Sequence, residues 1–576
     1  MKSSKSSKPK RPSVAAVAVK PEAERRRLWI YAVGLAVTFI VVLQVYWPAM
    51  RGPFLLDDTY QPYMQPYYTD APLKAWLVGV RPLLMFSYWL NFKQSGDETF
   101  GYHLGNVLLH FLNGILIFLA VRKALSWIQV NRPRQEILAL FSAGLFLFHP
   151  LQTESVSYVA SRSETLSVFF VLAAFIVFLY RKTASVGWGT TAIVLAIFGA
   201  AVLTKEHTAV LPALLLITDY YWNPGFSFAG IRQNWKLYVP IVAGGVAGVA
   251  YVFSVLSGSM SAGFAMKDLT WYQYFFTQCR AIWVYIRLFL LPFGQNADYD
   301  FPISHSILDE GAIFGFLGLA AVSVAAWIYR RKYPLASYGW FTFLILIAPT
   351  SSFVPIRDPI AERRLYLPFI GLLFITVEFV RRWKTSRTTL IGVLGIVLLA
   401  EAALSYQRNE LWGSATALWR DTARKSPHKV RPQFQLAYVE FQQQACSAAV
   451  DDYAKAARIA PPTDDLLIDW ALAYDCAGQS DGAIEKLKQA AALRPSAPVY
   501  SNLAREYGKT GKYPEALEAL EKAEKADPKF AMTYYTRGAV YESEGNRAQA
   551  IDEYRRALNL DGHIQAARAA LQRLGQ

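Results

Sequence analysis

Long apolar runs separated by short polar segments dominate the first 405 residues of the chain. We interpret eleven of them as membrane spans, because about 20 mainly apolar residues cross a bilayer as a helix. The short run at 137–149 is expected to continue into the helical loop after it. The sequence therefore predicts an all-α, polytopic helix bundle over residues 28–405, with spans at 28–47, 104–121, 137–149, 165–180, 188–203, 207–222, 237–256, 311–329, 335–350, 366–380 and 388–405.

Basic residues occupy alternate loops between these runs, which orients the bundle. Arg122-Lys123, Arg181-Lys182 and Arg381-Arg382 fall on one side together with the basic tail at 1–27. Cytoplasmic loops carry such an excess of Lys and Arg. No small-residue cleavage site follows the first run, so we expect a retained signal anchor. The topology is then N-terminus inside and C-terminus outside.

The stretch 275–291 allows two interpretations. It is apolar enough to span, but Arg280 and Arg287 lie seven residues apart on one helical face. As a span it would move Arg330-Arg331-Lys332 to the outside. As an amphipathic helix in the interface it leaves them inside. We favour the interfacial interpretation.

A repeat pattern begins at about residue 406. Pro427, Pro461, Pro495 and Pro528 recur in steps of 34, 34 and 33, and Gly478, Gly511 and Gly545 in steps of 33 and 34. A period of 34, with Gly at the turn between two helices and Pro after the second, is typical of tetratricopeptide repeats. We expect a half-repeat at 406–428, a weaker repeat at 431–460 and three clear ones. Such stacks often bind an extended peptide; a spacer or a dimer contact is the alternative.

Composition narrows the class of protein. The chain has 53% hydrophobic and 15% aromatic residues and a net charge of +16. Because the basic residues follow the membrane topology, this charge does not indicate nucleic-acid binding. The three cysteines have no CxxC or Cys/His spacing, so we predict neither a zinc site nor a disulfide framework.

Polar clusters gather on the side with few basic residues. Asp57-Asp58 follows the first span, where two carboxylates close to hydrocarbon are costly. Either could act as a general base or hold a metal ion, and a helix cap or solvated turn is the simpler alternative. His103 and His110 share a helical face but lack a third ligand, so we interpret them as packing or hydrogen-bond anchors.

Three further clusters carry cations on this side. Glu154, Tyr158 and Arg162 are spaced by four, which would place them on one helix face, as a brace or as a phosphate pocket. Lys205 could extend harmlessly to the interface or meet a lipid phosphate. Glu362-Arg363-Arg364 places two arginines where few are expected. A lipid phosphate is their favoured partner, and pairing with Asp358 or Glu362 is the alternative.

These residues together resemble a known family. Asp57-Asp58, Arg81-Pro82, Tyr-His-x-x-Asn-x-x-x-His at 102–110, His-Pro-x-x-Thr-Glu at 149–154 with Arg162-x-Glu164, Lys205-Glu206 and Glu-Arg-Arg-Leu-Tyr-Leu-Pro at 362–368 are similar to motifs of GT-C superfamily membrane glycosyltransferases. With the repeats, the chain most resembles the transmembrane and tetratricopeptide-repeat O-mannosyltransferases or a prokaryotic relative. The resemblance covers residues 28 to 570, although region 257–300 is short and matches poorly.

The resemblance implies transfer of a sugar from a polyprenyl- or dolichyl-phosphate carrier to a hydroxyl of a protein. It assigns the base to Asp57 or Asp58, with Asp57 slightly favoured. Phosphate or substrate contacts would come from Arg162, Lys205, Glu206, Arg280, Arg363 and Arg364, with support from Arg81, His103, His149, Glu154, Glu164 and Glu362. The resemblance does not decide which sugar is transferred or whether a divalent metal is needed.

Two other functions fit the same sequence. One is a membrane-anchored scaffold that displays repeats, and the other is a transporter of the lipid-linked sugar. Matched halves with broken spans, which many transporters have, are not evident in the sequence. We expect the repeats on the non-cytoplasmic side. The few cysteines favour a bacterial cytoplasmic membrane over that of the endoplasmic reticulum.

Overall fold

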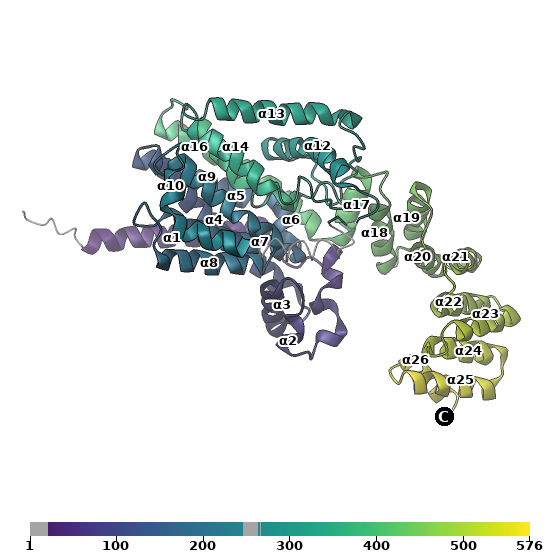
Figure 1. Cartoon of the computed structure of the whole chain (residues 1–576). Coiled ribbons are helices and arrows are strands. Elements are labelled where there is room, and N and C mark those ends of the chain that lie inside the picture. The colour runs from purple at the N-terminus through teal and green to yellow at the C-terminus, as the bar shows by residue number, and fades with distance from the viewer. Residues whose placement is uncertain (1–20, 246–262, 265) are drawn as a thin grey trace, which may run out of the picture.

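The computed structural model describes residues 21–245, 263–264 and 266–576, which form helices joined by turns, without a strand. Figure 1 shows two parts, a bundle of long helices and a curved array of short helices, α17 to α26, that leads away from it. The all-α class and the order of the two parts are as the sequence predicts.

The bundle contains the predicted apolar runs as helices. All the runs except 237–256 coincide with a described helix; that run is helical at 237–245, and the rest of it lies outside the described residues. The helices are α1 (Pro21–Tyr46), α4 (Thr99–Trp127), α5 (Arg132–Phe148), α7 (Arg162–Leu179), α8 (Trp188–Val202), α9 (Leu211–Trp222), α13 (Ala312–Ile328), α14 (Pro334–Ile347), α15 (Phe369–Val380) and α16 (Arg387–Trp412).

Length and composition distinguish most of these helices. Five helical segments are long and apolar enough to cross a membrane, or six if α5 and its bent continuation count as one span. The helices α8, α14 and α15 are apolar but shorter, with 10–17 residues. The structure thus contains several candidate spans, and the number eleven stays a prediction.

Short helices and turns fill one end of the bundle, which we name the loop end. It carries the 3-10 helices η2 (Leu56–Tyr60), η6 (Val159–Ser161), η7 (Glu206–Val210) and η9 (Glu362–Leu365), and the helices α2 (Leu73–Trp76), α3 (Pro82–Ser95) and α6 (Thr153–Ser157). The first loop has an aromatic core of its own around Tyr63, Trp76 and Tyr88, all at most 4% exposed. This packing gives η2 a fixed position.

The helix α12 (Trp271–Leu290) lies along the loop end. Near its start Phe275 stacks on Phe353, in the loop after α14. Near its end Phe289 packs against His149 and Phe369, where α5 ends and α15 begins. Both ends of α12 therefore contact the same end of the bundle, as an interfacial helix would, and α12 is not among the candidate spans.

One helix predicted from the sequence is absent. α6 ends at Ser157, Tyr158 is extended with φ −85° and ψ 117°, and α7 starts only at Arg162. Glu154, Tyr158 and Arg162 therefore do not share one helix face, and that prediction is wrong. The extended Tyr158 separates the three side chains, so a spacing of four does not align them.

The repeat array confirms the predicted period. Its helices are α17 (Ala415–Lys425), α18 (Val430–Gln442), α19 (Cys446–Ile459), α20 (Asp464–Cys476), α21 (Ser480–Leu493), α22 (Ala497–Lys509), α23 (Tyr513–Ala526), α24 (Ala531–Glu544), α25 (Arg547–Leu560) and α26 (Gln565–Arg573). Gly478, Gly511 and Gly545 follow the first helix of a pair with φ between 73° and 86°, a conformation that glycine adopts without strain. Prolines 461, 495 and 528 each follow the second helix by two residues.

The array is attached firmly to the bundle. α16 continues without a break past residue 405, so the last predicted span and the half-repeat share one helix. At the start of α18, Arg431 and Lys429 bind Asp298 and lie 2.9 and 3.1 Å from Asp358. Although burial acts in the opposite direction, these two cations lower the pKa of Asp358 to about 2. Charged pairs of this kind fix the first repeat against the loop end.

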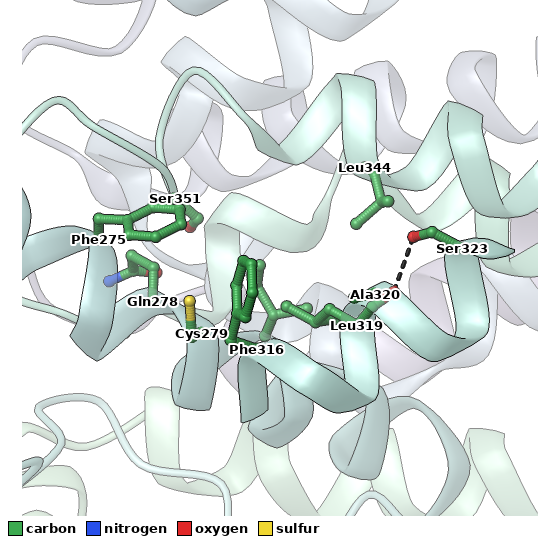
Figure 2. A pocket seen from close by; sticks show the side chains of 10 residues that line it. Phe275, Gln278, Cys279, Phe316, Leu319, Ala320, Ser323, Leu344 and Ser351 are labelled. Carbon is green, nitrogen blue, oxygen red and sulfur yellow. Dashed lines mark hydrogen bonds between the residues drawn. The ribbon is translucent and has the colours of Figure 1, made fainter. Parts of the chain in front are cut away.

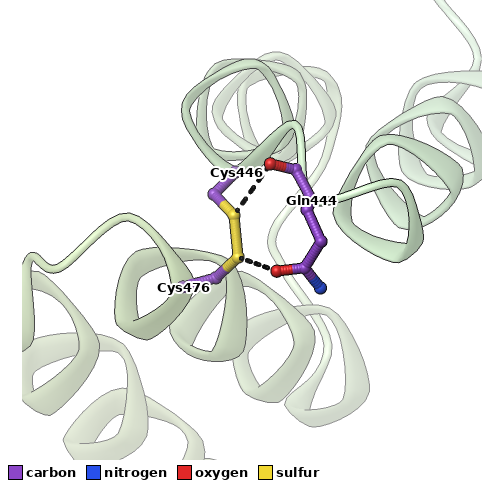
Figure 3. The surroundings of a disulfide bond; sticks show 3 residues. All are labelled: Gln444, Cys446 and Cys476. Atoms are coloured by element: carbon purple, nitrogen blue, oxygen red, sulfur yellow. Dashed lines mark hydrogen bonds between the residues drawn. A yellow bond between two sulfur atoms is a disulfide. The ribbon is translucent and has the colours of Figure 1, made fainter.

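A disulfide bond corrects one prediction from the sequence. Cys446, at the start of α19, is bonded to Cys476, at the end of α20, with Gln444 beside the bond (Figure 3). The two cysteines are 30 residues apart, and Cys279 is free and buried. Cysteine spacing did not indicate this pair because the period of the repeats, not a local motif, brings the two helix ends together.

Candidate functional site

The two adjacent carboxyl groups have different environments. Asp58 is 1% exposed and accepts hydrogen bonds from Leu55 N (2.9 Å), the Tyr63 hydroxyl (3.0 Å) and Ala160 N (2.7 Å). Burial raises the pKa of Asp58 to about 7 despite these donors. Asp57 has an exposed side chain, and its backbone N–H donates to the Tyr158 hydroxyl at 2.8 Å. Asp58 thus holds the turn together, and Asp57 is free to contact a substrate.

Arg363 lies beside Asp57. Its guanidinium is 5.9 Å from the Tyr158 ring, and it forms an ion pair with Glu154. The Arg363 backbone N–H donates to the other oxygen of Glu154 at 3.1 Å. Burial opposes the charge of Arg363, but Glu154 raises its pKa above the ordinary value. With 26% of its side chain exposed, Arg363 presents a fixed positive charge toward the open side.

A second group of cations comes from η7 and the first loop. Lys205 donates to Glu164 at 2.5 Å and to Ser163 at 3.1 Å. Arg81 forms two parallel hydrogen bonds with Glu206, at 3.0 and 2.9 Å. Burial lowers the pKa of Lys205, and the nearby charges of Arg81 and Arg363 act in the same direction. The charges of both arginines therefore act on the Lys205 ammonium group.

We name Asp57, Arg81, Lys205 and Arg363 the loop-end site. Four separate segments supply these residues: η2, the turn before α3, the turn before η7, and η9. Each cation is paired with one carboxylate, from Glu206, Glu164 or Glu154. Such pairing lets three cations share a small volume and still direct remaining N–H groups toward an anion.

Arg162 does not belong to this site. It is 2% exposed, and its guanidinium donates to Asn106 (2.8 Å), to the carbonyls of Ser87 (3.2 Å) and Tyr102 (2.8 Å), and to Asn91. The Tyr88 ring covers it at 4.9 Å. The interpretation of Arg162 as a phosphate ligand is therefore corrected. It connects the first loop to α4 and α7, because a buried guanidinium requires acceptors for its N–H groups.

Arg364 and Arg280 are also engaged elsewhere. Arg364 donates to the Tyr274 hydroxyl (3.2 Å) and to the carbonyls of Pro359 (3.0 Å) and Asp358 (2.6 Å). Arg280 donates to the Pro302 carbonyl and to Ser304, both at 3.0 Å, and lies 3.5 Å from Glu310. Both arginines stabilise the loops beside α12, so the structure does not support them as phosphate ligands.

The other predicted supporting residues act as anchors. His103 bonds the Gly52 carbonyl at 3.2 Å, and His149 bonds the Phe289 carbonyl at 3.0 Å. Glu362 accepts from Gln295 (2.8 Å), Asn296 N (2.7 Å) and the Tyr299 hydroxyl (2.7 Å). These bonds fix the segments that carry Asp57 and Arg363, as the sequence suggested for His103.

Two side chains near the site were not assigned to it from the sequence, although Tyr158 was noted for its spacing from Glu154 and Arg162. Tyr158 connects Asp57 and Arg363 and stacks on Trp412 of α16 at 6.1 Å. His207 lies 3.4 Å from Glu164, opposite Lys205. The position of Tyr158 depends on the break between α6 and α7, and the regular helix assumed from the spacing concealed it.

Neither a metal site nor the apolar cavity beside α12 coincides with these residues. Within the described part of the chain, no group of three or more His, Cys, Asp or Glu could hold a metal ion, so the divalent metal stays a prediction without assigned ligands. A cavity of about 250 Å³ lies between α12, α13 and α14 (Figure 2), lined by residues such as Phe275, Cys279 and Phe316. None of the predicted site residues lines it.

Comparison with known proteins shows relatives of both parts. A TPR repeat family matches residues 504–545, and a tetratricopeptide repeat family matches 532–564. A protein O-mannosyl-transferase of Caenorhabditis elegans is 24% identical over 375 residues, which cover 62% of this chain and 50% of that protein. The protein O-mannosyl-transferase TMTC3 of Homo sapiens is 22% identical over 535 residues, covering 84% of this chain and 57% of that protein.

These relatives confirm the resemblance to the transmembrane and tetratricopeptide-repeat O-mannosyltransferases. The protein O-mannosyl-transferase Tmtc1 of Drosophila melanogaster is 34% identical, but over only 135 residues, or 23% of this chain and 15% of that protein. The chain spans about half the length of the first two relatives.

Proposed function

We propose that the chain is a glycosyltransferase that moves a sugar, mannose by the names of its relatives, from a polyprenyl- or dolichyl-phosphate carrier to a hydroxyl of a protein. The observation that carries the proposal is the loop-end site. It combines one exposed carboxylate, Asp57, with the cations Arg363, Lys205 and Arg81 at one end of an apolar bundle. A phosphate-linked sugar whose carrier lies in the lipid suits this combination.

Asp57 would take the proton of the acceptor hydroxyl. The oxygen attacks the anomeric carbon, the bond from that carbon to the phosphate oxygen breaks, and the carrier phosphate leaves with the electron pair. Attack opposite the leaving group inverts the anomeric configuration. A general base and a stabilised leaving group are the two requirements of this reaction.

Arg363 and Lys205 would stabilise the negative charge on the departing phosphate. Arg363 is suited to this because Glu154 fixes its position while part of its guanidinium stays exposed. Preorganised donors at a place where charge develops contribute most to such a reaction. Arg81, bound to Glu206 on both oxygens, would act mainly by setting the position of η7.

The proposed reaction takes place on the non-cytoplasmic face. Two observations support this side: the positive-inside pattern of the sequence, and the disulfide in the repeats, which is of a kind that forms in oxidising compartments. The repeats would recruit the acceptor protein, since stacked helix pairs form concave surfaces that bind extended segments.

Purified protein, incubated with mannosyl and glucosyl polyprenyl phosphates and a Ser/Thr-containing peptide, tests the proposal by mass spectrometry. We expect a glycopeptide from the full chain and none from Asp57→Asn. Asp70→Asn, in the same loop, is the matched control and should retain activity. A folded full chain that forms no product with any of these donors would favour a scaffold. Carrier translocation without product would favour a transporter.

A further inference from the structure

A second pocket lies at the end of the bundle opposite the loop-end site. α4, α7 and α9 all end there, at Trp127, Leu179 and Trp222. The pocket has a volume of about 230 Å³, and three basic residues line it, namely Lys123, Arg181 and Lys182. None of the residues assigned to sugar transfer takes part in it.

One carboxylate also lines the pocket, but its charge is already neutralised. Asp219 is fully buried and binds Arg181 at 3.0 Å. It also accepts from Asn223 (3.2 Å), Asn234 (2.6 Å) and the Tyr238 hydroxyl (2.7 Å). With four donors on its two oxygens, Asp219 has little capacity left to bind a further cation.

The two lysines are not used by the surrounding protein. In the part of the chain that the structure describes, the ammonium group of neither Lys123 nor Lys182 forms a hydrogen bond or an ion pair. Lys123 lies only over aromatic rings, 5.3 Å from the centre of Tyr180 and 6.0 Å from that of Trp127. Two ammonium groups thus remain available at this pocket.

The ends of the helices do not account for these lysines. Cations often offset the partial negative charge of carbonyl groups at helix C-termini. Arg181 does so, since it donates to the carbonyls of Phe178 (2.8 Å) and Ala184 (3.3 Å). Lys123 and Lys182 bond no carbonyl among the described residues, so their charge is left for another partner.

An aromatic side chain beside the pocket carries a further unused donor, which is neutral. Trp222 lines the pocket and stacks on Trp127 with ring centres 5.4 Å apart. Its indole N–H is buried and has no acceptor among the described residues. A buried donor without an acceptor costs free energy, which a bound oxygen would recover.

We propose that this pocket binds the phosphate group of an anionic membrane lipid. Its unused charged groups are the two ammonium groups of Lys123 and Lys182, which suits an anion with several oxygens. The pocket lies where three helices of the apolar bundle end, at the depth of lipid headgroups. Lys123 and Lys182 would bind the phosphate oxygens, while the stacked rings of Trp127 and Trp222 lie at the boundary with the acyl chains.

Native mass spectrometry of the detergent-purified full chain tests this site with phosphatidylglycerol, with phosphatidylcholine as the neutral lipid. We expect the parent protein to retain several phosphatidylglycerol molecules. In Lys123→Gln/Lys182→Gln, retention of the most tightly bound molecule should fall at least five-fold. Lys384→Gln/Arg387→Gln removes two charges from the same end of the bundle, outside the pocket, and should keep it. Trp222→Phe, which keeps the ring but removes the N–H, should weaken retention by a smaller factor.

Inorganic phosphate, measured by calorimetry on the same variants, separates a lipid from a soluble source. The lipid proposal is supported if the Lys123/Lys182 double variant loses the lipid and if added phosphate does not displace the lipid from the parent protein. If the double variant loses only the binding of inorganic phosphate, the site binds a soluble phosphate and the lipid proposal is overturned. Equal losses in the two double variants, or no loss in either, overturn the pocket. Transferase activity and melting temperature should stay unchanged throughout, which makes this outcome independent of the loop-end site.

Discussion

Glu154 binds Arg363 with both oxygens of its carboxylate, one through an ion pair with the guanidinium and one through the backbone N–H at 3.1 Å. The two residues are 209 positions apart in the sequence. Glu154 is 1% exposed, so this contact takes place largely without water. It fixes both the side chain and the backbone of Arg363, and with them the direction of the positive charge beside Asp57.

Glu154→Gln should therefore reduce sugar transfer more than it reduces donor binding. The amide of Gln keeps one acceptor but cannot form the ion pair. Arg363 is therefore held less rigidly when the carrier phosphate leaves. We expect kcat to fall about ten-fold or more, as is typical when a preorganised charge is disturbed. Steady-state kinetics with a lipid-phosphate mannose measure this.

The matched control is Glu136→Gln, which breaks the pair between Glu136 and Arg122 at 2.8 Å. That pair lies away from the loop end and should leave kcat unchanged. Equal effects of the two substitutions would mean that the loss reflects stability and not the site.

The environment of Asp58 predicts a pH dependence of stability. Its pKa is about 7 in the folded protein and about 4 in an unfolded chain, so the folded state binds more protons between these values. Its contribution to stability is full below pH 4 and is lost as the pH rises through 7. We expect the melting temperature of the parent protein to fall by several degrees from pH 5 to pH 8 relative to Asp58→Asn.

Thermal unfolding at both pH values measures this difference. It is followed by the fluorescence of a dye that does not react with cysteine thiols. Asp58→Asn should also be less stable at every pH, because an amide cannot serve all three donors that Asp58 accepts from. A parallel pH dependence in the two proteins would contradict the role assigned to Asp58.

The sequence predicted the components of the site better than their arrangement. Apolar periodicity and charge placed Asp57, Lys205 and Arg363 in loops of one side, and the structure brings them to one end of the bundle. Local spacing failed for Arg162, since the extended Tyr158 breaks the helix that would have aligned it with Glu154. Arg364 could not be separated from Arg363, because which of two adjacent arginines turns to Tyr274 depends on packing against α12.

Tyr158→Phe tests how Asp57 is held. The ring would still stack on Trp412, but the backbone N–H of Asp57 would lose its acceptor. We expect kcat to fall about ten-fold with KM nearly unchanged, because the substitution moves the carboxylate and not the phosphate ligands. Tyr534→Phe in the repeats is a suitable control. A rise in KM with constant kcat would instead assign Tyr158 to donor binding.

Removing the disulfide should loosen the repeats and leave the bundle unchanged. The bond joins the start of α19 to the end of α20 at a sequence separation of 30, which corresponds to about 3.6 kcal/mol of unfolding free energy in the loop-entropy estimate. Cys446→Ser/Cys476→Ser should therefore lower the unfolding temperature of the repeats, while Cys279→Ser, inside the bundle, should not. Differential scanning calorimetry of the full chain measures this.

Thiol labelling of whole cells before and after reduction tests whether the same bond forms in the cell. Free thiols at Cys446 and Cys476 before reduction would argue against repeats in an oxidising compartment.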